Sequence, residues 1–344
     1  MKKTLVLVLS LALTMALVLC ACSGGASSQA SSTAPDSQAA AEGSSAPAAD
    51  SFSLTYRSGA TGGCFYPVSA AMAEFLPKSI EGLDSVTVTP GTGQANIQAV
   101  QDKECDIAFA KLPGTIQAIH GEAPFEAVCD GVANLMYFYD EAFHFVVLAD
   151  SGIETVADLP GHTLATQTIG NQAEQMTREV LEAYGLTYED MGNVTQVNDY
   201  NDAIEMMKNG QVEAFTFANA VPVTVLTDLA SVRDIRILSL SPEALEHVLS
   251  CNDGYVSSII PAGTYKGQDA DIQSFGGAIH VICNKDMDEE LAYELVKYTC
   301  ENLSTIQTCH AAFTDLTVER MGQKLALDFH PGAERYFREV GVIK

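Results

Sequence analysis

Three short segments of the chain combine glycines with hydroxyl and amide side chains, the residue types that bind a small polar solute without reacting with it. They span residues 59–66, 91–96 and 168–172, and each stands between a strand-like and a helix-like stretch. Glycine allows a ligand to approach the backbone closely, and free N–H groups at a helix start attract anions. Asn and Gln side chains both donate and accept hydrogen bonds. We therefore expect a site for a solute with a carboxylate and an amine or amide.

A glycine-rich turn by itself is more often only a turn than a binding loop. Three such turns at equivalent places favour binding, because ligands of open α/β sheets lie outside the carboxyl ends of the strands. Phe65 and Tyr66 follow the first turn directly and are expected to form walls of the site. The candidate ligand-binding residues are Thr61, Gly62, Gly63, Phe65, Tyr66, Thr92, Gly93, Gln94, Asn96, Lys111, Thr168, Gly170, Asn171, Gln172, Thr216 and Asn219.

Cations are scarce in this chain, so their positions matter. The 344 residues include 18 Lys and Arg against 44 Asp and Glu, a formal net charge of −26. Such an acidic surface repels nucleic acids and anionic lipid headgroups, which excludes polyanions as partners. Lys111 and Arg57 each stand at a strand end. Each either faces a ligand carboxylate in the cleft or is an ordinary surface cation, and the sequence leaves both interpretations open.

Motifs for hydrolysis, phosphoryl transfer and metal binding do not occur in the sequence. It lacks H-E-x-x-H, the Walker Gly-Lys-Ser/Thr, G-x-S-x-G and the EF-hand loop. The seven histidines are scattered; His144 lies in an apolar strand-like run and is expected in the core, and His330 in a structural turn. We therefore expect no catalytic activity, no cofactor and no bound metal.

The elements that must position the site alternate regularly from residue 52 onward. Strand-like stretches of five or six residues are followed by amphipathic helical stretches, which is typical of an α/β fold. An apolar share of 47% is enough for one large or two medium domains. These alternating strand-like and helical stretches form two successive series along the chain, which indicates two lobes. We expect lobe 1 over residues 51–148, lobe 2 over residues 149–270, and a strand return with C-terminal helices over residues 271–344 that pack mainly on lobe 1.

The N-terminus has the pattern of an exported protein. Lys2 and Lys3 precede an apolar run over residues 5–19, which is too short for a good membrane span. The run ends in Leu19-Cys20-Ala21-Cys22, which resembles a bacterial lipobox with Cys22 as the lipidated residue. We expect a signal peptide over residues 1–21 and a lipid anchor in the bacterial cell membrane, with plain secretion or a retained anchor as alternatives. Residues 22–50 are expected to form a disordered Ser/Ala/Gly linker.

Seven cysteines follow Cys22, and none forms a C-x-x-C motif or a cluster with histidine. An odd number leaves at least one unpaired, so we expect buried free thiols. A disulfide between Cys300 and Cys309 is the alternative, which their place on helix-like stretches disfavours.

Several segments resemble the TAXI family, the solute receptors of tripartite ATP-independent periplasmic (TRAP) transporters. The likeness covers residues 52–344 in order and is carried by residues 59–67, 96–101, 106–109, 144–153, 260–269 and 330–339. The resemblance implies a type II periplasmic-binding-protein fold with two lobes around a ligand cleft. It also implies a monomeric receptor that delivers a small carboxylate, with a glutamate- or glutamine-like solute as the family-based expectation, to TRAP membrane permease subunits.

Two positions depart from the family's Gly-Ser-Gly-Thr-Glu-like loop. Gln172 replaces a glycine and Ala173 replaces the threonine, while Ala220 replaces a further family glycine. We expect these departures, Ala173 included, to affect which solute is selected. The alternative function from another class is a surface lipoprotein or sensor module of the same fold that presents a ligand signal to a partner, and an enzyme on this fold is the third.

The lipobox interpretation predicts that Cys22→Ser releases the protein from the membrane. Two or more acyl chains anchor a protein stably, because each buried methylene contributes about 0.8 kcal/mol. Fractionation of cells that express wild type or Cys22→Ser measures the effect, and equal membrane retention of the two would contradict the interpretation.

Overall fold

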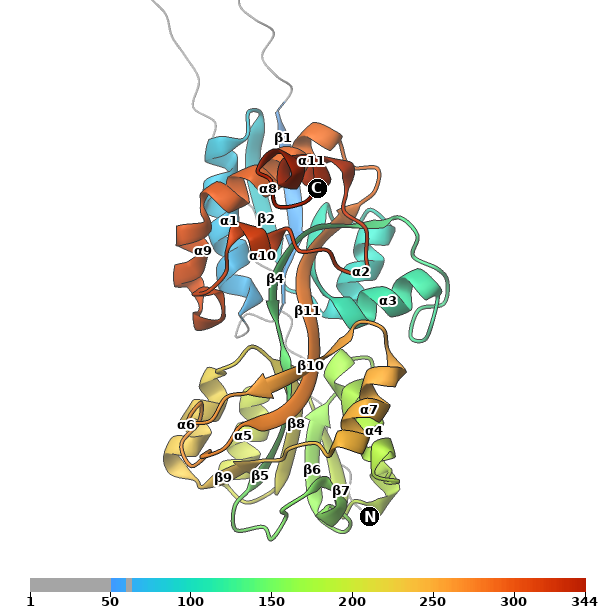
Figure 1. Ribbon diagram of the computed structural model, residues 1–344, viewed down its shortest axis with the longest axis vertical. Coiled ribbons are helices and arrows are strands. Elements are labelled where there is room, and N and C mark those ends of the chain that lie inside the picture. The colour runs from blue at the N-terminus through green and yellow to red at the C-terminus, as the bar shows by residue number, and fades with distance from the viewer. Residues whose placement is uncertain (1–50, 60–63) are drawn as a thin grey trace, which may run out of the picture. The chain divides into compact units, whose positions relative to one another are not determined.

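The computed structural model describes residues 51–59 and 64–344 (Figure 1). The predicted signal peptide, Cys22 and the linker up to residue 50 lie outside the described residues. The candidate site residues Thr61, Gly62 and Gly63 lie outside them too.

The first lobe contains a sheet with the strand order β2-β1-β3-β11-β4. Its strands are β1 (Phe52–Arg57), β2 (Leu83–Thr89), β3 (Ile107–Lys111), β4 (Val132–Asp140) and β11 (Ile272–Asn284). β1 is parallel to β2 and β3, whereas β11 is antiparallel to β3 and β4. β4 and most of β11 are buried on both faces and are correspondingly mostly apolar.

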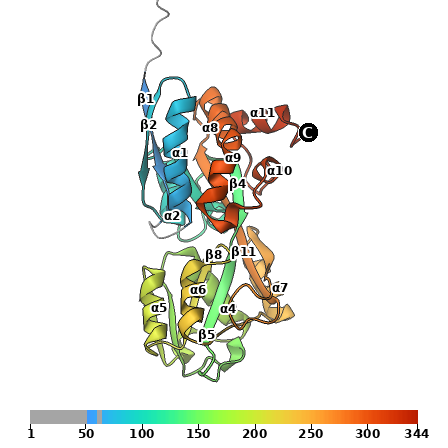
Figure 2. The same ribbon diagram turned by 90° about the vertical axis from the view of Figure 1, so that its left-hand side faces the viewer.

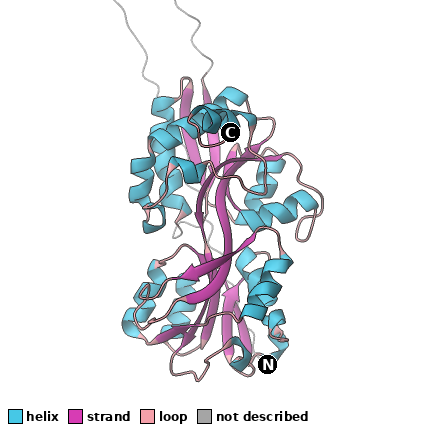
Figure 3. Ribbon diagram, viewed as in Figure 1, coloured by secondary structure: helices cyan, strands magenta, loops and turns pink. Residues whose placement is uncertain are grey.

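Helices cover both faces of this sheet (Figure 3). The helices of the first lobe are α1 (Phe65–Ser79), α2 (Gly93–Gln101), α3 (Leu112–His120), α8 (Glu289–Glu301), α9 (Leu303–Cys309), α10 (Val318–Met321) and α11 (Pro331–Glu339). One core lies on the side of α1, α8, α9 and α11, and a smaller core lies on the side of α2 and α3. The C-terminal helices thus pack on the first sheet.

The second lobe repeats the same strand pattern, in the order β7-β6-β8-β5-β9. Its strands are β5 (Ala142–Leu148), β6 (Thr163–Gln167), β7 (Asn193–Val197), β8 (Ala214–Asn219) and β9 (Ile235–Ile237). Its helices are α4 (Gln172–Ala183), α5 (Tyr200–Lys208), α6 (Thr224–Val232) and α7 (Pro242–Cys251). β6 is parallel to β7 and β8, and β5 is antiparallel to β8 and β9. This is the expected mixed α/β, type II two-lobe fold.

The chain crosses between the lobes on two adjacent strands, as the course of β11 shows in Figures 1 and 2. Only Glu141 separates β4 of the first sheet from β5 of the second. β11 makes the return crossing: residues 272–277 pair with β10 (Tyr255–Ile260), and residues 278–284 pair with β4. Where the strands meet, the Glu141 N–H donates to the Gly277 carbonyl at 3.1 Å. A Cβ at position 276 would lie 1.7 Å from the Glu141 carbonyl oxygen, so only glycine fits there.

The boundary between the lobes lies at Glu141, not at residue 148 as expected from the sequence. The apolar run over residues 132–148 is two strands in two different sheets, because the run is interrupted by Asp140 and Glu141.

The seven described cysteines are free thiols, and Cys300 and Cys309 lie on separate helices. Five of the seven are buried, as expected. Among residues 51–59 and 64–344, no helix has both the length and the hydrophobicity needed to cross a bilayer.

Three histidines have structural roles. His144 is fully buried, with its ring nitrogens 2.9 Å from the Ala142 carbonyl oxygen and 3.0 Å from the Tyr265 hydroxyl, which confirms the core placement. His330 precedes α11, and its Nδ1 accepts from the Gly332 N–H at 3.2 Å, which confirms the structural turn. His280 is fully buried between Thr115 and Asn134.

Burial lowers the pKa of His144 to about 4 and that of His280 to about 3. Both are neutral in the folded protein, whereas an unfolded chain protonates them below pH 6.5. Below that pH the unfolded state binds more protons, so stability falls as the pH is lowered. We expect the free energy of unfolding to fall between pH 6.5 and 4 by up to about 1.4 kcal/mol per pH unit for each histidine. Urea unfolding of wild type and His144→Gln measures this, and an unchanged slope in the variant would contradict it.

Candidate functional site

A cavity of about 200 Å³ lies between the lobes, at the carboxyl ends of the parallel strands of both sheets. Both lobes supply its walls. The lining residues are Gly59, Cys64, Phe65, Gly91, Thr92, Gly93, Gln94, Lys111, Gly114, Tyr139 and Glu141 on one side, and Gln167, Gly170, Asn171, Gln172, Asn198, Asp199, Tyr200, Asn201, Ala218, Asn219 and Val225 on the other. The cavity therefore occupies the position that open α/β sheets use for ligands.

The start of α2 forms one side of this cavity. Thr92 precedes the helix with extended backbone, and its side chain caps no N–H group within the described residues. The backbone N–H groups of Gly93 and Gln94 lie at the positive end of the helix, and such groups are suited to bind an anion. The stem of Lys111 lies over this turn, with its Cγ 3.6 Å from where a Cβ on Gly93 would stand. A helix N-terminus and a cation therefore share this side of the cavity.

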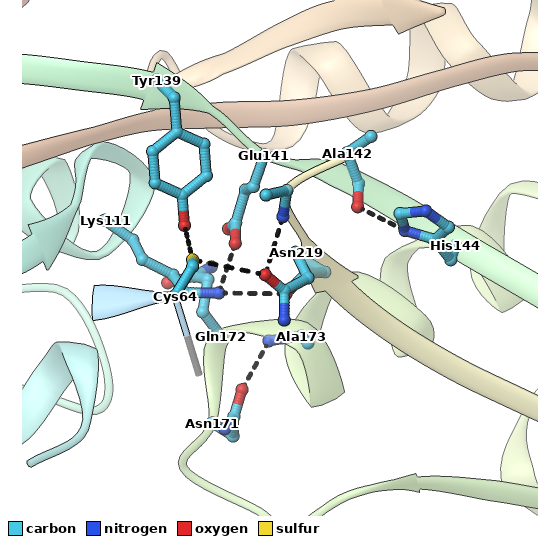
Figure 4. A network of polar contacts seen from close by, with 12 residues as sticks. Cys64, Lys111, Tyr139, Glu141, Ala142, His144, Asn171, Gln172, Ala173 and Asn219 are labelled. Atoms are coloured by element: carbon cyan, nitrogen blue, oxygen red, sulfur yellow. Dashed lines mark hydrogen bonds and ion pairs between the residues drawn. The ribbon is translucent and has the colours of Figure 1, made fainter. Parts of the chain in front are cut away.

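Lys111 and Glu141 form a buried ion pair in the cavity wall (Figure 4). The Lys111 ammonium donates to Glu141 Oε2 at 2.5 Å and approaches the Ala218 carbonyl oxygen at 3.5 Å. The side chains are 15% and 2% exposed. Burial raises the pKa of the Glu141 carboxyl, and the Lys111 ammonium acts in the opposite direction. Through these two contacts, Lys111 of the first lobe is connected to Glu141, where the chain crosses between the lobes, and to the end of β8 in the second lobe.

Three buried polar atoms in the cavity wall have no hydrogen-bond partner in the described part of the chain. They are Glu141 Oε1, Gln167 Nε2 and Gln172 Oε1. A buried polar group without a partner costs about 1–3 kcal/mol, so native proteins rarely leave one unpaired. Three such atoms around one cavity indicate a place where a polar ligand completes the hydrogen bonding.

The second lobe presents the start of α4 to the cavity. Asn171 caps this helix, because its Oδ1 accepts from the Ala173 N–H at 2.9 Å. Gln172 Nε2 donates to the Tyr255 hydroxyl at 3.1 Å, and that hydroxyl donates to Glu179 Oε2 at 2.7 Å. These bonds hold the Gln172 amide in one orientation.

A second helix of this lobe, α5, also begins at the cavity. Asp199 caps it through a 2.8 Å bond from the Asn201 N–H. The Tyr200 ring packs on Phe217, with centroids 5.2 Å apart. The two helix starts give the second lobe a mostly polar wall.

Aromatic rings and a thiol complete the wall of the first lobe. Phe65 stacks on Phe109 with centroids 4.6 Å apart. Cys64 contacts the Tyr139 hydroxyl and, at 3.6 Å, the amide oxygen of Asn219 in the second lobe (Figure 4). Burial raises the pKa of the Cys64 thiol to about 11, so it carries its proton at neutral pH and is a poor nucleophile.

Nine of the sequence-predicted residues line this cavity. They are Phe65, Thr92, Gly93, Gln94, Lys111, Gly170, Asn171, Gln172 and Asn219. The structure brings them together from distant turns of the chain, because all of these turns follow the carboxyl ends of strands.

Four other predicted residues, Tyr66, Asn96, Thr168 and Thr216, do not line the cavity. The fully buried Asn96 donates to the Ser58 and Phe109 carbonyl oxygens at 2.7 and 2.9 Å, so it joins the end of β1 to the middle of β3. The fully buried Thr216 accepts from the Thr177 hydroxyl under α4 at 2.8 Å. Tyr66 stands beside Phe65 on α1, and the Thr168 hydroxyl donates to Asn198 at 3.3 Å.

The structure corrects the expectation for Ala173 and answers the question that the sequence left open for Arg57. The Ala173 side chain is fully buried in the core of the second lobe, so a threonine there could not present its hydroxyl to the cavity. Arg57 lies near Glu104, 3.8 Å away, and is not among the cavity residues.

Sequence reasoning missed Tyr139, Glu141, Gln167 and residues 198–201. The only signal for Glu141 was a charged pair, Asp140-Glu141, inside a long apolar run. In residues 51–59 and 64–344, no group of three or more His, Cys, Asp and Glu side chains is arranged to hold a metal ion.

Comparison with known proteins gives one family match and several structural likenesses. The profile of the NMT1-like family matches residues 57–341. The structure is similar to an ancestral arginine-binding protein bound to arginine, at 15% identity over 76% of this chain and 97% of that chain, with a TM-score of 0.46. It is similar to XAC2383 from Xanthomonas citri bound to ATP, at 13% identity over 84% and 96% of the chains, with a TM-score of 0.49. It is also similar to the periplasmic aliphatic sulphonate binding protein SsuA from Escherichia coli, at 14% identity over 85% and 88%, with a TM-score of 0.46.

The position of Asn96 predicts that Asn96→Ala destabilises the first lobe. The substitution leaves two buried carbonyl oxygens without their donor, so we expect the free energy of unfolding to fall by about 2 kcal/mol or more. Gln98→Ala, on the exposed side of the same helix, is the matched control and should change it by less than about 0.5 kcal/mol. Urea unfolding followed by circular dichroism measures both, and equal effects would contradict the assigned role.

Proposed function

The chain belongs to the NMT1-like family and has the two-lobe fold of periplasmic binding proteins, and we propose that it is an extracytoplasmic solute receptor without catalytic activity. It holds a small carboxylate or amino-acid-like solute in the cavity between its lobes. The observation that carries this proposal is the pairing of an uncapped helix start with Lys111 in a cavity lined from both lobes.

The carboxylate of the solute lies at the start of α2. Backbone N–H groups of Gly93 and Gln94 bind its oxygens, and Lys111 supplies the positive charge. The remainder of the solute reaches Asn171, Gln172 and the α5 start on the second lobe. Contacts with both lobes favour the closed arrangement, because a ligand shifts a conformational equilibrium only by binding one state more tightly.

Three features support the finer parts of the proposal. The lipobox-like Cys22 and the following linker support a lipid-anchored protein outside the cytoplasm. The segments that resemble TAXI receptors support a glutamate- or glutamine-like solute and TRAP permease subunits as the partner. The protonated state of Cys64 supports binding without covalent chemistry.

The proposal predicts that L-glutamate or L-glutamine binds, and that Lys111→Met weakens binding about tenfold or more, the worth of a charge-assisted hydrogen bond. Lys103→Met is the matched control, because Lys103 pairs with Asp286 away from the cavity and should keep wild-type affinity. Isothermal titration calorimetry measures affinity, and circular dichroism verifies that each variant is folded.

X-ray scattering of the wild type should show a smaller radius of gyration with the bound solute. Native mass spectrometry of protein purified without refolding tests for a solute that is already retained. Equal affinity of Lys111→Met and Lys103→Met, or binding with no change in radius from a verified open state, would count against this site.

A further inference from the structure

Glu141 is the most deeply buried charged side chain of the cavity wall, and only one of its oxygens is paired. Its Oε2 is bound by Lys111, whereas Oε1 has no partner in the described part of the chain. The side chain is 2% exposed, so bulk water does not solvate this oxygen. A carboxylate oxygen accepts hydrogen bonds, so its missing partner is a donor.

Gln172 adds a second acceptor of known orientation. Its Nε2 donates to the Tyr255 hydroxyl, whose own proton is donated to Glu179 Oε2. Glu179 Oε1 in turn accepts from Gln175 Nε2 at 2.9 Å. Because the Tyr255 proton is already used, the Gln172 amide cannot be reversed, and Oε1 is the atom that remains unpartnered.

The two unpartnered acceptors belong to different parts of the molecule. Glu141 stands at the crossing between the lobes, and Gln172 stands at the start of α4 in the second lobe. Both line the same cavity. A group with several N–H donors and a positive charge matches a carboxylate oxygen and an amide oxygen together, whereas a second carboxylate would be repelled by Glu141.

Resting on the function proposed above, we propose that Glu141 and Gln172 bind the amino group of the solute. Glu141 is then the residue that determines specificity, and the cavity selects amino acids over carboxylates of the same length that lack the amine. Lys111 has two roles in this arrangement. It faces the carboxylate of the solute, and it neutralises the Glu141 carboxylate, which faces the amine of the solute.

Matched pairs of ligands and variants test this inference. The ligand pairs are L-glutamate against glutarate and 2-oxoglutarate, and L-glutamine against glutaramate, each titrated by calorimetry. Wild type should bind the amine-bearing member about tenfold or more tightly than its partner. Glu141→Gln should remove this preference. It weakens amino-acid binding, and it leaves glutarate binding unchanged or stronger because Lys111 loses its competing partner.

Two further variants separate recognition from folding. Gln172→Met keeps the size of the side chain but removes the acceptor, so it should weaken L-glutamate binding more than glutarate binding and thereby lower the amine preference. Asp140→Asn removes a neighbouring charge on a side chain that is 44% exposed and outside the cavity, and it should bind all ligands as wild type does. Thermal unfolding followed by circular dichroism confirms that each variant is folded at the titration temperature.

The outcomes distinguish this inference from the proposed function. If wild type binds glutarate as tightly as L-glutamate, or if folded Glu141→Gln and Gln172→Met both keep the amine preference, the inference is overturned and the receptor function stands. If no member of either pair binds to wild type, the proposed function fails and the inference fails with it.

Discussion

The close approach of two backbones at Glu141 is the constraint on which the architecture of this protein depends. A single residue separates β4 of the first sheet from β5 of the second, and position 276 on the returning strand β11 accepts no side chain at the contact. The two crossings are therefore adjacent and hydrogen-bonded to each other. The same contact places the Glu141 carboxylate at the meeting point of the lobes, within the otherwise apolar run over residues 132–148.

The repeated strand order explains why one cavity collects so many turns. In each sheet the parallel strands end at the side facing the other lobe. Beside them lies an antiparallel strand that continues a crossing between the lobes, β11 in the first sheet and β5 in the second. Helix starts after those strands bring backbone N–H groups to the cavity. Helix N-termini carry partial positive charge, so this geometry creates a site for an anion in a chain whose net charge is −26.

Charge inside the cavity is arranged differently from charge on the surface. Most acidic side chains are solvated, whereas Glu141 is buried and opposed by a single lysine. Burying charge is costly unless it is paired and hydrogen-bonded, and among the described residues that line the cavity one carboxylate oxygen and two amide atoms are still unpaired. Such incomplete pairing is expected where a bound solute completes the hydrogen bonding.

The sequence by itself determined the fold class, because alternating strand and helix periods are local properties of the chain. It also placed the glycine-rich turns and the other candidate residues at strand ends, and nine of these candidates line the cavity. It could not distinguish a side chain that faces the cavity from a neighbour that faces the core: Phe65 faces the cavity where Tyr66 does not, and Gln172 lines it while Ala173 packs inward. Nor could it reveal α3, whose first turn contains Pro113 and Gly114, or the role of Glu141. Those were decided by tertiary structure, because the direction of a side chain and the partner of a buried charge depend on strands that are distant in sequence and meet only in the folded protein.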